Sequence, residues 1–183
     1  GSYKTYQEVK KLAREHWSKF SPQPYQVSQS NINVSGNYIG NSKNCQECFQ
    51  VNGVEDCKYL FMMESPPTKD CYDITSWGNN LSLSYECLIS GEFASGMKFC
   101  YESGINLHDA EYCKLSTGGS HHFGCVSVKK GDYVIFNKPY HKDDYEILRE
   151  KIINHMNETP YTDRQGKVYK YGEFFPTEMS TFA

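Results

Sequence analysis

Residues 98–126 read KFCYESGINLHDAEYCKLSTGGSHHFGCV, and cysteine recurs within them at positions 100, 113 and 125. The recurrence extends toward the N-terminus, where further short segments are also built on a cysteine. The seven cysteines that take part are Cys45, Cys57, Cys71, Cys87, Cys100, Cys113 and Cys125. The steps in sequence between successive members are similar in length, and the longest leads from Cys71 to Cys87. A short repeating period of this kind indicates a repeat architecture.

Each unit has room for two short strands and two turns, and glycine and asparagine between the cysteine segments supply the turns. Strands stacked in parallel about 4.8 Å apart place equivalent positions of each unit in the interior. Cysteine packs as a small, polarizable apolar residue and suits a narrow core. The sequence therefore predicts a mainly-β fold, a parallel β-solenoid (β-helix) in which the seven cysteines form a structural ladder. The spacing allows either one or two units per coil.

Three parts are expected along the chain. Residues 3–24 form an N-terminal capping helix and linker, residues 25–140 the solenoid, and residues 141–183 a C-terminal helix and tail. Apolar residues at spacings of three and four predict the helices over 3–20 and 142–156. A solenoid needs covered ends because an open rung exposes core and unpaired strand edges. The aromatic-rich end of the tail indicates a truncated chain.

Composition excludes some partners. The net charge is -3, whereas nucleic-acid surfaces cluster Lys and Arg, so no direct nucleic-acid contact is expected. No apolar run approaches the roughly 18 residues of a membrane span. With eight cysteines and no export signal, reduced thiols and a cytoplasmic location are predicted. The expected partner is another protein or other domains of the same chain.

Three segments carry a resemblance: residues 124–130 (GCVSVKK), 135–140 (IFNKPY) and 171–176 (YGEFFP). They resemble uncharacterised proteins of candidate-phyla-radiation bacteria that are catalogued as zinc-binding-domain proteins. The resemblance covers residues 38–183 and implies cysteine-rich zinc modules outside the repeats, so that this chain would be the middle of a longer protein. It implies no particular activity.

The candidate metal ligands are Cys45, Cys48, His121, His122 and Cys125, with His108 and Cys113 nearby in sequence. Thiolates and imidazoles are the ligands that zinc prefers, so zinc is the one cofactor considered. Cys45 and Cys48 would need a turn between them, because residues i and i+3 of a strand face opposite sides. The alternative is that the cysteines are core and the two adjacent histidines lie in an exposed turn after Gly118-Gly119.

Acidic residues and tyrosines flank the cysteines. The acidic residues are Asp56, Asp70, Asp73, Glu86 and Glu102, and the tyrosines are Tyr59, Tyr72, Tyr85, Tyr101 and Tyr112. Two carboxylates that meet in one groove would support acid/base chemistry on a polysaccharide. The alternative is a solvated outer face, because a residue beside an inward one points outward. The tyrosines have different offsets from their cysteines, so they are not expected to share one face.

The function expected from these observations is a non-catalytic scaffold or binding module, and no catalytic residue is assigned. Two alternatives stay open. One is a carbohydrate-active β-helix enzyme, which rests on the acidic residues. The other is a zinc-dependent nucleic-acid-associated protein, which rests on the zinc modules that the resemblance implies.

Overall fold

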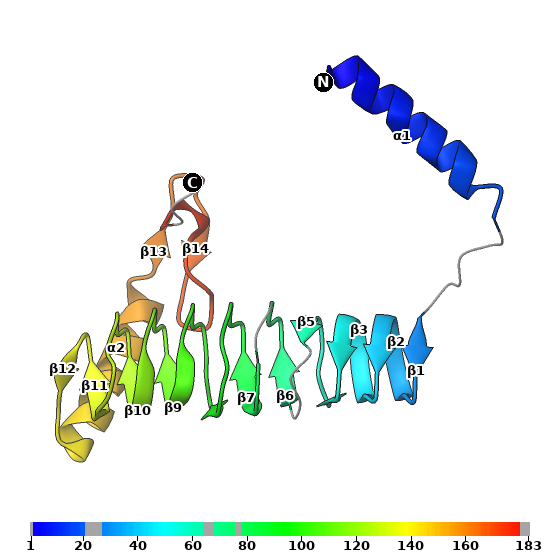
Figure 1. Cartoon of the computed structure of the whole chain (residues 1–183). Coiled ribbons are helices and arrows are strands. Elements are labelled where there is room, and N and C mark those ends of the chain that lie inside the picture. Colours follow the sequence, from blue (N-terminus) through cyan, green and yellow to red (C-terminus); the bar gives the residue numbers. More distant parts are fainter. Residues whose placement is uncertain (1, 21–26, 64–67, 76–77, 180–183) are drawn as a thin grey trace.

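The computed structural model of the chain describes residues 2–20, 27–63, 68–75 and 78–179. Its main body is a parallel β-solenoid of about eight turns, with one helix in each end region (Figure 1). The predicted fold class is confirmed.

The elements follow one another along a single stack. They are α1 (Tyr3–Trp17), β1 (Ser28–Gln29), β2 (Ile32–Gly40), β3 (Lys43–Asn52), β4 (Val54–Glu55), β5 (Phe61–Met63), β6 (Thr68–Tyr72), β7 (Leu81–Tyr85), β8 (Ala94–Ser95), β9 (Gly104–Glu111), β10 (Thr117–Phe123), β11 (Asp132–Ile135), β12 (Lys138–Pro139), α2 (Lys142–Glu158), β13 (Tyr161–Thr162) and β14 (Val168–Tyr169), followed by a short 3-10 turn (Thr177–Met179). Strands β1 to β11 pair in parallel, and β12 turns back antiparallel to β11.

The register gives the length of one coil. Lys43 pairs with Glu55 and Val54 pairs with Thr68, so one coil leads from position 43 to position 55 and from position 54 to position 68. These steps match the spacing of the cysteines. Each coil therefore contains one unit of the sequence repeat, and the wider coil with two units is wrong.

Within a coil, every third residue points into the interior. In one coil the inward residues, at most 2% exposed, are Leu81, Ser84, Cys87 and Ser90. The residues immediately before them, with φ between 45° and 51°, are Asn80, Leu83, Glu86 and Ile89. This left-handed conformation turns the chain before each inward residue. Four inward positions thus close one coil.

Cysteine and serine share a hydrogen-bonding role at the inward positions. Each donates from its side chain to the carbonyl oxygen two residues earlier: Sγ of Cys87 to Tyr85 at 3.4 Å, and Oγ of Ser90 to Leu88 at 3.4 Å. Sγ of Cys100 donates in the same way to Lys98 at 3.3 Å. A small side chain with one donor thus fills the narrow core and satisfies a buried carbonyl, which is costly to leave unpaired.

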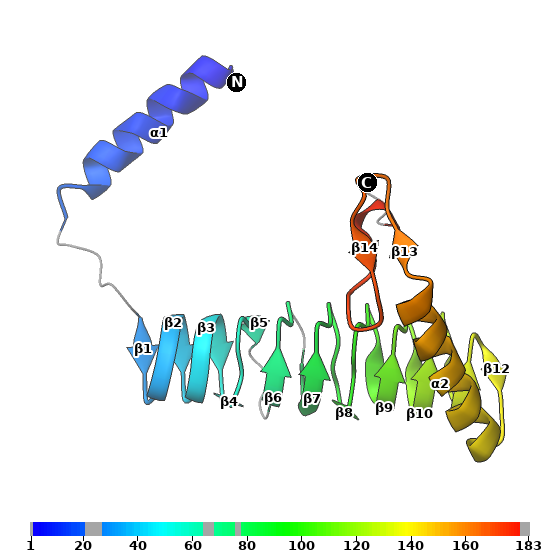
Figure 2. The same cartoon turned by 180° about the vertical axis from the view of Figure 1, so that it is seen from behind.

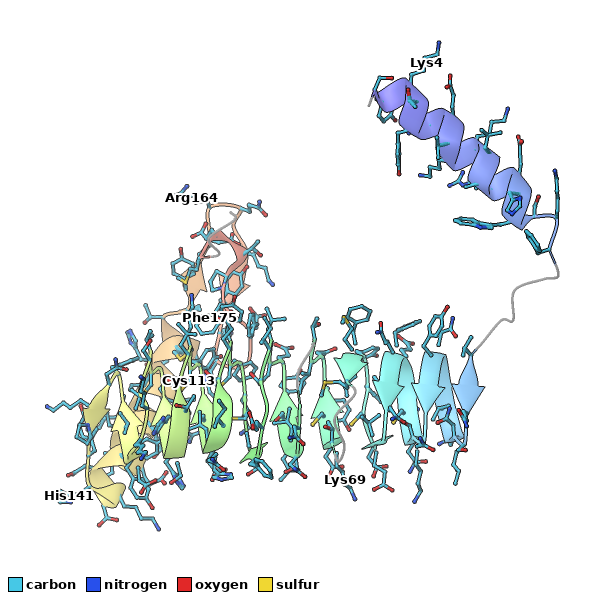
Figure 3. All side chains as sticks on the ribbon, viewed as in Figure 1. Lys4, Lys69, Cys113, His141, Arg164 and Phe175 are labelled. Carbon is cyan, nitrogen blue, oxygen red and sulfur yellow. The ribbon has the colours of Figure 1, made fainter. Side chains whose placement is uncertain are left out.

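The cysteines occupy two columns rather than one ladder. The first cysteine column contains Cys45, Cys57 and Cys71. The second cysteine column lies one inward position further along each coil and contains Cys87, Cys100, Cys113 and Cys125. Figure 3 shows Cys113 within the coils and Lys69 projecting outward. All eight cysteines are free and buried.

The two helices differ in their packing. α2 lies against the last coils, where Tyr145 packs with Phe123 and Ile135 (Figure 2). α1 has no buried residue, so its capping role stays a prediction, and residues 21–24 of the predicted linker lie outside the described part. In the tail, the turn at residues 163–166 joins β13 to β14, as predicted. The tail beyond Met179 also lies outside the described residues.

Candidate functional site

The outward residues between the inward columns form four long faces. One face, called the polar face, has an outer row of Lys43, Glu55, Lys69, Ser82, Ser95, His108, Ser120 and Asp132. Nζ of Lys43 and Nζ of Lys69 lie 3.6 and 3.7 Å from the Glu55 carboxylate. These side chains are about half exposed, so the ion pairs add little stability.

A second face, called the helix-bearing face, carries α2 on its C-terminal half. Its outer row is Gln46, Lys58, Tyr72, Tyr85, Lys98, Glu111, Phe123 and Ile135. Glu111 is 7% exposed and accepts hydrogen bonds from Arg149 at 2.7 Å and from the Tyr171 hydroxyl at 3.0 Å. The N-terminal half of this row is not covered in this way, and Tyr72 and Tyr85 are exposed there.

A third face, called the apolar face, exposes large apolar side chains along the solenoid. Its outer row runs through Phe49, Phe61, Thr75, Leu88, Tyr101, Lys114 and Val126. The adjoining positions add Tyr38, Met62, Ile89 and Leu115. The exposed fractions reach 48% at Phe49, 44% at Phe61 and 50% at Val126. A contiguous exposed apolar surface of this kind marks an interaction site more often than scattered apolar residues do.

Two open grooves border the apolar face. One, of about 730 Å³, lies at the N-terminal coils and is lined by Val27, Tyr38 and Gln50 among others. The other, of about 360 Å³, is lined by Asp73, Glu86, Cys87, Leu88 and Phe174. The second groove puts two carboxylates beside an apolar floor. The fourth face carries glycine- and asparagine-rich turns, such as Asn41 hydrogen-bonded to Asn52 at 2.9 Å.

Sequence reasoning did not single out the apolar face. Its members lie one full coil apart in sequence, so they form no local cluster. The pattern is visible only once the inward positions are known, because each outer-row residue directly follows an inward one: Phe49 follows Cys48, Leu88 follows Cys87 and Val126 follows Cys125.

The predicted Cys45–Cys48 pair lies entirely in the interior. Glu47, with φ of 54°, supplies the turn between the two thiols, so both point inward rather than to opposite sides. Their Sγ atoms donate to the carbonyl oxygens of Lys43 at 3.1 Å and Gln46 at 3.4 Å. A hydrogen bond from Cys48 lowers the pKa of Cys45 to about 7. These contacts are those of core residues.

The structure separates the two adjacent histidines, and the expectation of an exposed turn for them is wrong. Both belong to β10, because the chain after Gly118-Gly119 continues as a strand. His122 is fully buried, and its Nε2 lies 2.8 Å from the carbonyl oxygen of Gly131. His121 lies on the outside, with its ring 4.7 Å from that of Tyr133. His108 is exposed and bonded to Ser95 at 2.8 Å.

A zinc site therefore stays a prediction. Cys113 and Cys125 are neighbours in the second cysteine column, and His122 points into the same interior. Within the described ranges, no three His, Cys, Asp or Glu side chains are grouped so that they could hold a metal ion. Buried Nδ1 of His122 has no hydrogen-bond partner among the described atoms.

The acidic residues are distributed over three faces. Asp56 and Asp70 lie on the polar face, and Glu102 lies on the apolar face. Only Asp73 and Glu86 come together, in the smaller groove. All five have φ between 45° and 56°, a conformation that Asp and Asn adopt more readily than most residues. Their place before an inward residue thus has a backbone cause.

The tyrosines also divide between faces, as the sequence predicts. Tyr59, Tyr72, Tyr85 and Tyr112 lie on the helix-bearing face and Tyr101 on the apolar face. Tyr112 packs between Phe99 and the tail, and burial raises its pKa to about 12. Tyr101 has Nζ of Lys114 over its ring at 5.2 Å.

Neither described helix has the length and apolar character to span a bilayer.

Comparisons with known proteins add little. No protein family model and no curated protein sequence matches the chain. Among solved structures, a UDP-N-acetylglucosamine O-acyltransferase from Moraxella catarrhalis RH4 is similar at 13% identity, over 73% of this chain and 83% of that chain. The TM-score is 0.20, so no functional argument is based on this likeness.

Proposed function

We propose that the chain is a non-catalytic binding module that docks a protein partner on its apolar face. The supporting observation is that Phe49, Phe61, Leu88 and Val126 recur on one row of a regular stack and stay exposed. Eight rungs at about 4.8 Å extend this row over about 34 Å. The thiols and hydroxyls of the interior are engaged with backbone carbonyls, which assigns them to stability.

The apolar face fits a helical partner. A helix rises about 5.4 Å per turn, close to the rung spacing, so successive turns of one helix meet successive rungs. Phe and Met side chains provide large contact areas for such docking. The carboxylates of Asp73 and Glu86 border the face and favour basic residues on the partner's flank.

A photo-crosslinking amino acid at position 115 tests this function in the cells from which the sequence comes. A discrete crosslinked product is expected there, whereas the same amino acid at position 83 on the polar face should give none. Val126→Asp, one coil away, should reduce the yield at position 115 at least several-fold. Equal products from positions 115 and 83, or a yield that Val126→Asp leaves unchanged, would contradict the proposal.

A carbohydrate-active enzyme is the second candidate function, and one observation favours it. Asp73 and Glu86 lie on neighbouring rungs and share a groove with Phe174, and the row beside them carries Tyr72 and Tyr85. Polysaccharide turnover that disappears in Glu86→Gln and Asp73→Asn, but persists in Asp70→Asn, would establish it over the first candidate.

A further inference from the structure

The apolar face and α1 leave complementary surfaces uncovered within one chain. The apolar stripe of α1 is exposed, with exposed fractions of 58% at Tyr6, 58% at Val9 and 66% at Trp17. The helix has no buried residue. An amphipathic helix of this length is marginal in water without a surface to pack on. A stable α1 therefore needs an apolar partner surface.

The connection brings α1 to the apolar face. The solenoid begins at Val27, whose carbonyl oxygen accepts a hydrogen bond from Ile39 N at 3.1 Å, so Val27 lies on the rung before Tyr38. Residues 18–26 join Trp17 to this point, and nine residues reach at most about 30 Å. A tether of this length holds the helix at an effective concentration in the millimolar range.

The dimensions and charges also agree. The 15 residues of α1 span about 22 Å, which corresponds to four or five rungs, from Tyr38 to Ile89. Four basic residues flank the stripe of α1 against two acidic ones: Lys4, Lys10, Lys11 and Arg14 against Glu8 and Glu15. The border of the apolar face carries Asp73 and Glu86.

We infer that α1 folds back onto the N-terminal half of the apolar face of its own solenoid, between Tyr38 and Ile89. This inference rests on the proposed function, because it names the first occupant of the same face. The C-terminal part of the face, from Tyr101 to Val126, stays open for a separate partner. A partner that needs the whole face must displace α1, so the contact regulates access.

Trp17 reports on this contact. The other tryptophan, Trp77, is removed as Trp77→Phe, which leaves Trp17 as the single emitter of the full chain. Quenching by acrylamide is compared with that of a synthetic peptide of residues 1–20. Docking is expected to reduce the quenching constant at least threefold and to shift the emission to shorter wavelength.

Phe61→Asp, on the face, should restore quenching to the level of the peptide, and Phe49→Ser gives a milder second test. Leu83→Asp on the polar face is the matched control and should leave Trp17 shielded. Circular dichroism confirms that each variant is folded. Shielding should also persist on tenfold dilution.

Three results would overturn the inference: quenching in the parent chain equal to that of the peptide, shielding that Phe61→Asp and Phe49→Ser leave intact, or shielding lost on dilution, which would assign the contact to a second copy. Because crosslinking at position 115 lies outside the region that α1 covers, the proposed function survives if only this inference fails.

Discussion

The carboxylate of Glu111, on the solenoid, lies 2.7 Å from Nη2 of Arg149, on α2. The side chains of Glu111 and Arg149 are 9% and 27% exposed, and the tail joins them through the Tyr171 hydroxyl. Lys98 adds a weaker contact, with Nζ 3.6 Å from the same carboxylate oxygen. This cluster holds α2 and the tail on the last coils.

Arg149→Ala should therefore lower the free energy of unfolding by about 2–3 kcal/mol, because Glu111 loses a charged hydrogen bond while buried. Lys151→Ala, at an exposed position of the same helix, is the control and should change it by less than about 0.5 kcal/mol. Chemical denaturation measures both. The double variant Glu111→Met/Arg149→Met should recover much of the loss, and a loss equal to the sum of the two single variants would argue against coupling.

Cysteine and serine should be interchangeable at the inward positions. Cys113→Ser keeps a donor for the carbonyl oxygen of Glu111, which Cys113 Sγ reaches at 3.3 Å, and should cost about 1 kcal/mol or less. Cys113→Val removes the donor and adds volume, at a cost of about 2–4 kcal/mol. Thermal unfolding of both variants checks this order, and an equal or larger loss in the serine variant would be inconsistent with it.

The thiols should be reduced but protected. A thiol reagent is expected to react slowly with the native protein, because all eight cysteines are buried. In denaturant without reductant, the same assay should find close to eight thiols per chain. A much lower count would indicate disulfides and contradict the reduced core.

Alkaline pH should destabilise the fold. Burial raises the pKa of Cys100 well above its ordinary value, whereas an unfolded thiol titrates near pH ~8.5. Above that pH the unfolded chain loses a proton that the folded chain keeps, so stability falls as the pH rises. The loss for this one group is about 1.4 kcal/mol per pH unit until its folded pKa is reached.

Denaturation at pH 8, 9 and 10 in reductant measures this slope. Cys100→Ser should make it shallower by about 1.4 kcal/mol per pH unit. Lys114→Gln, at an outward position, should leave it unchanged. If Cys100→Ser has the slope of the parent chain, the thiol at position 100 does not titrate differently in the two states.

The solenoid was predictable from the cysteine period because stacked coils must be nearly equal in length. The one irregular step, from Cys71 to Cys87, has a structural cause. Cys71 pairs with Ser84 in the next coil, and Cys87 is the inward residue that follows Ser84. The step is one coil plus one inward position, and it moves the cysteines from the first to the second column.

The three-residue inward period was not predicted, because residue types other than cysteine fill it. Leu60 and Ile74 occupy the same column as Cys48 and Cys87, and a search for cysteine alone passes over them. The consistent local signal was Asn or Asp before an inward residue, as at Asn44 and Asp56. These residues were interpreted as possible chemistry when their role is the left-handed turn.

The candidate site was less predictable than the fold. The apolar face depends on which residues follow an inward position, and that depends on the length of each coil, which varies and which the sequence does not state. Phe61 and Leu88 become neighbours of Thr75 only through the register. The histidines were misplaced because Gly118-Gly119, which reads as a turn, continues a strand against β9 and β11.

An aspartate scan through the coil of residues 81–93 tests the central claim, that every third residue forms the core and the others are free for binding. Unfolding free energies should fall by several kcal/mol for aspartate at Leu81, Ser84, Cys87 and Ser90, because each change buries an unpaired charge. Gly91→Asp should be equally damaging, since its φ is 155° and a Cβ would lie 2.5 Å from Gly78 N.

Aspartate at the outward positions Ser82, Leu83, Tyr85, Leu88 and Ile89 should change the unfolding free energy by about 1 kcal/mol or less. The account predicts a profile with a period of three residues along the coil. A profile without that period, or aspartate tolerated at Cys87 with an unchanged melting temperature, would contradict it.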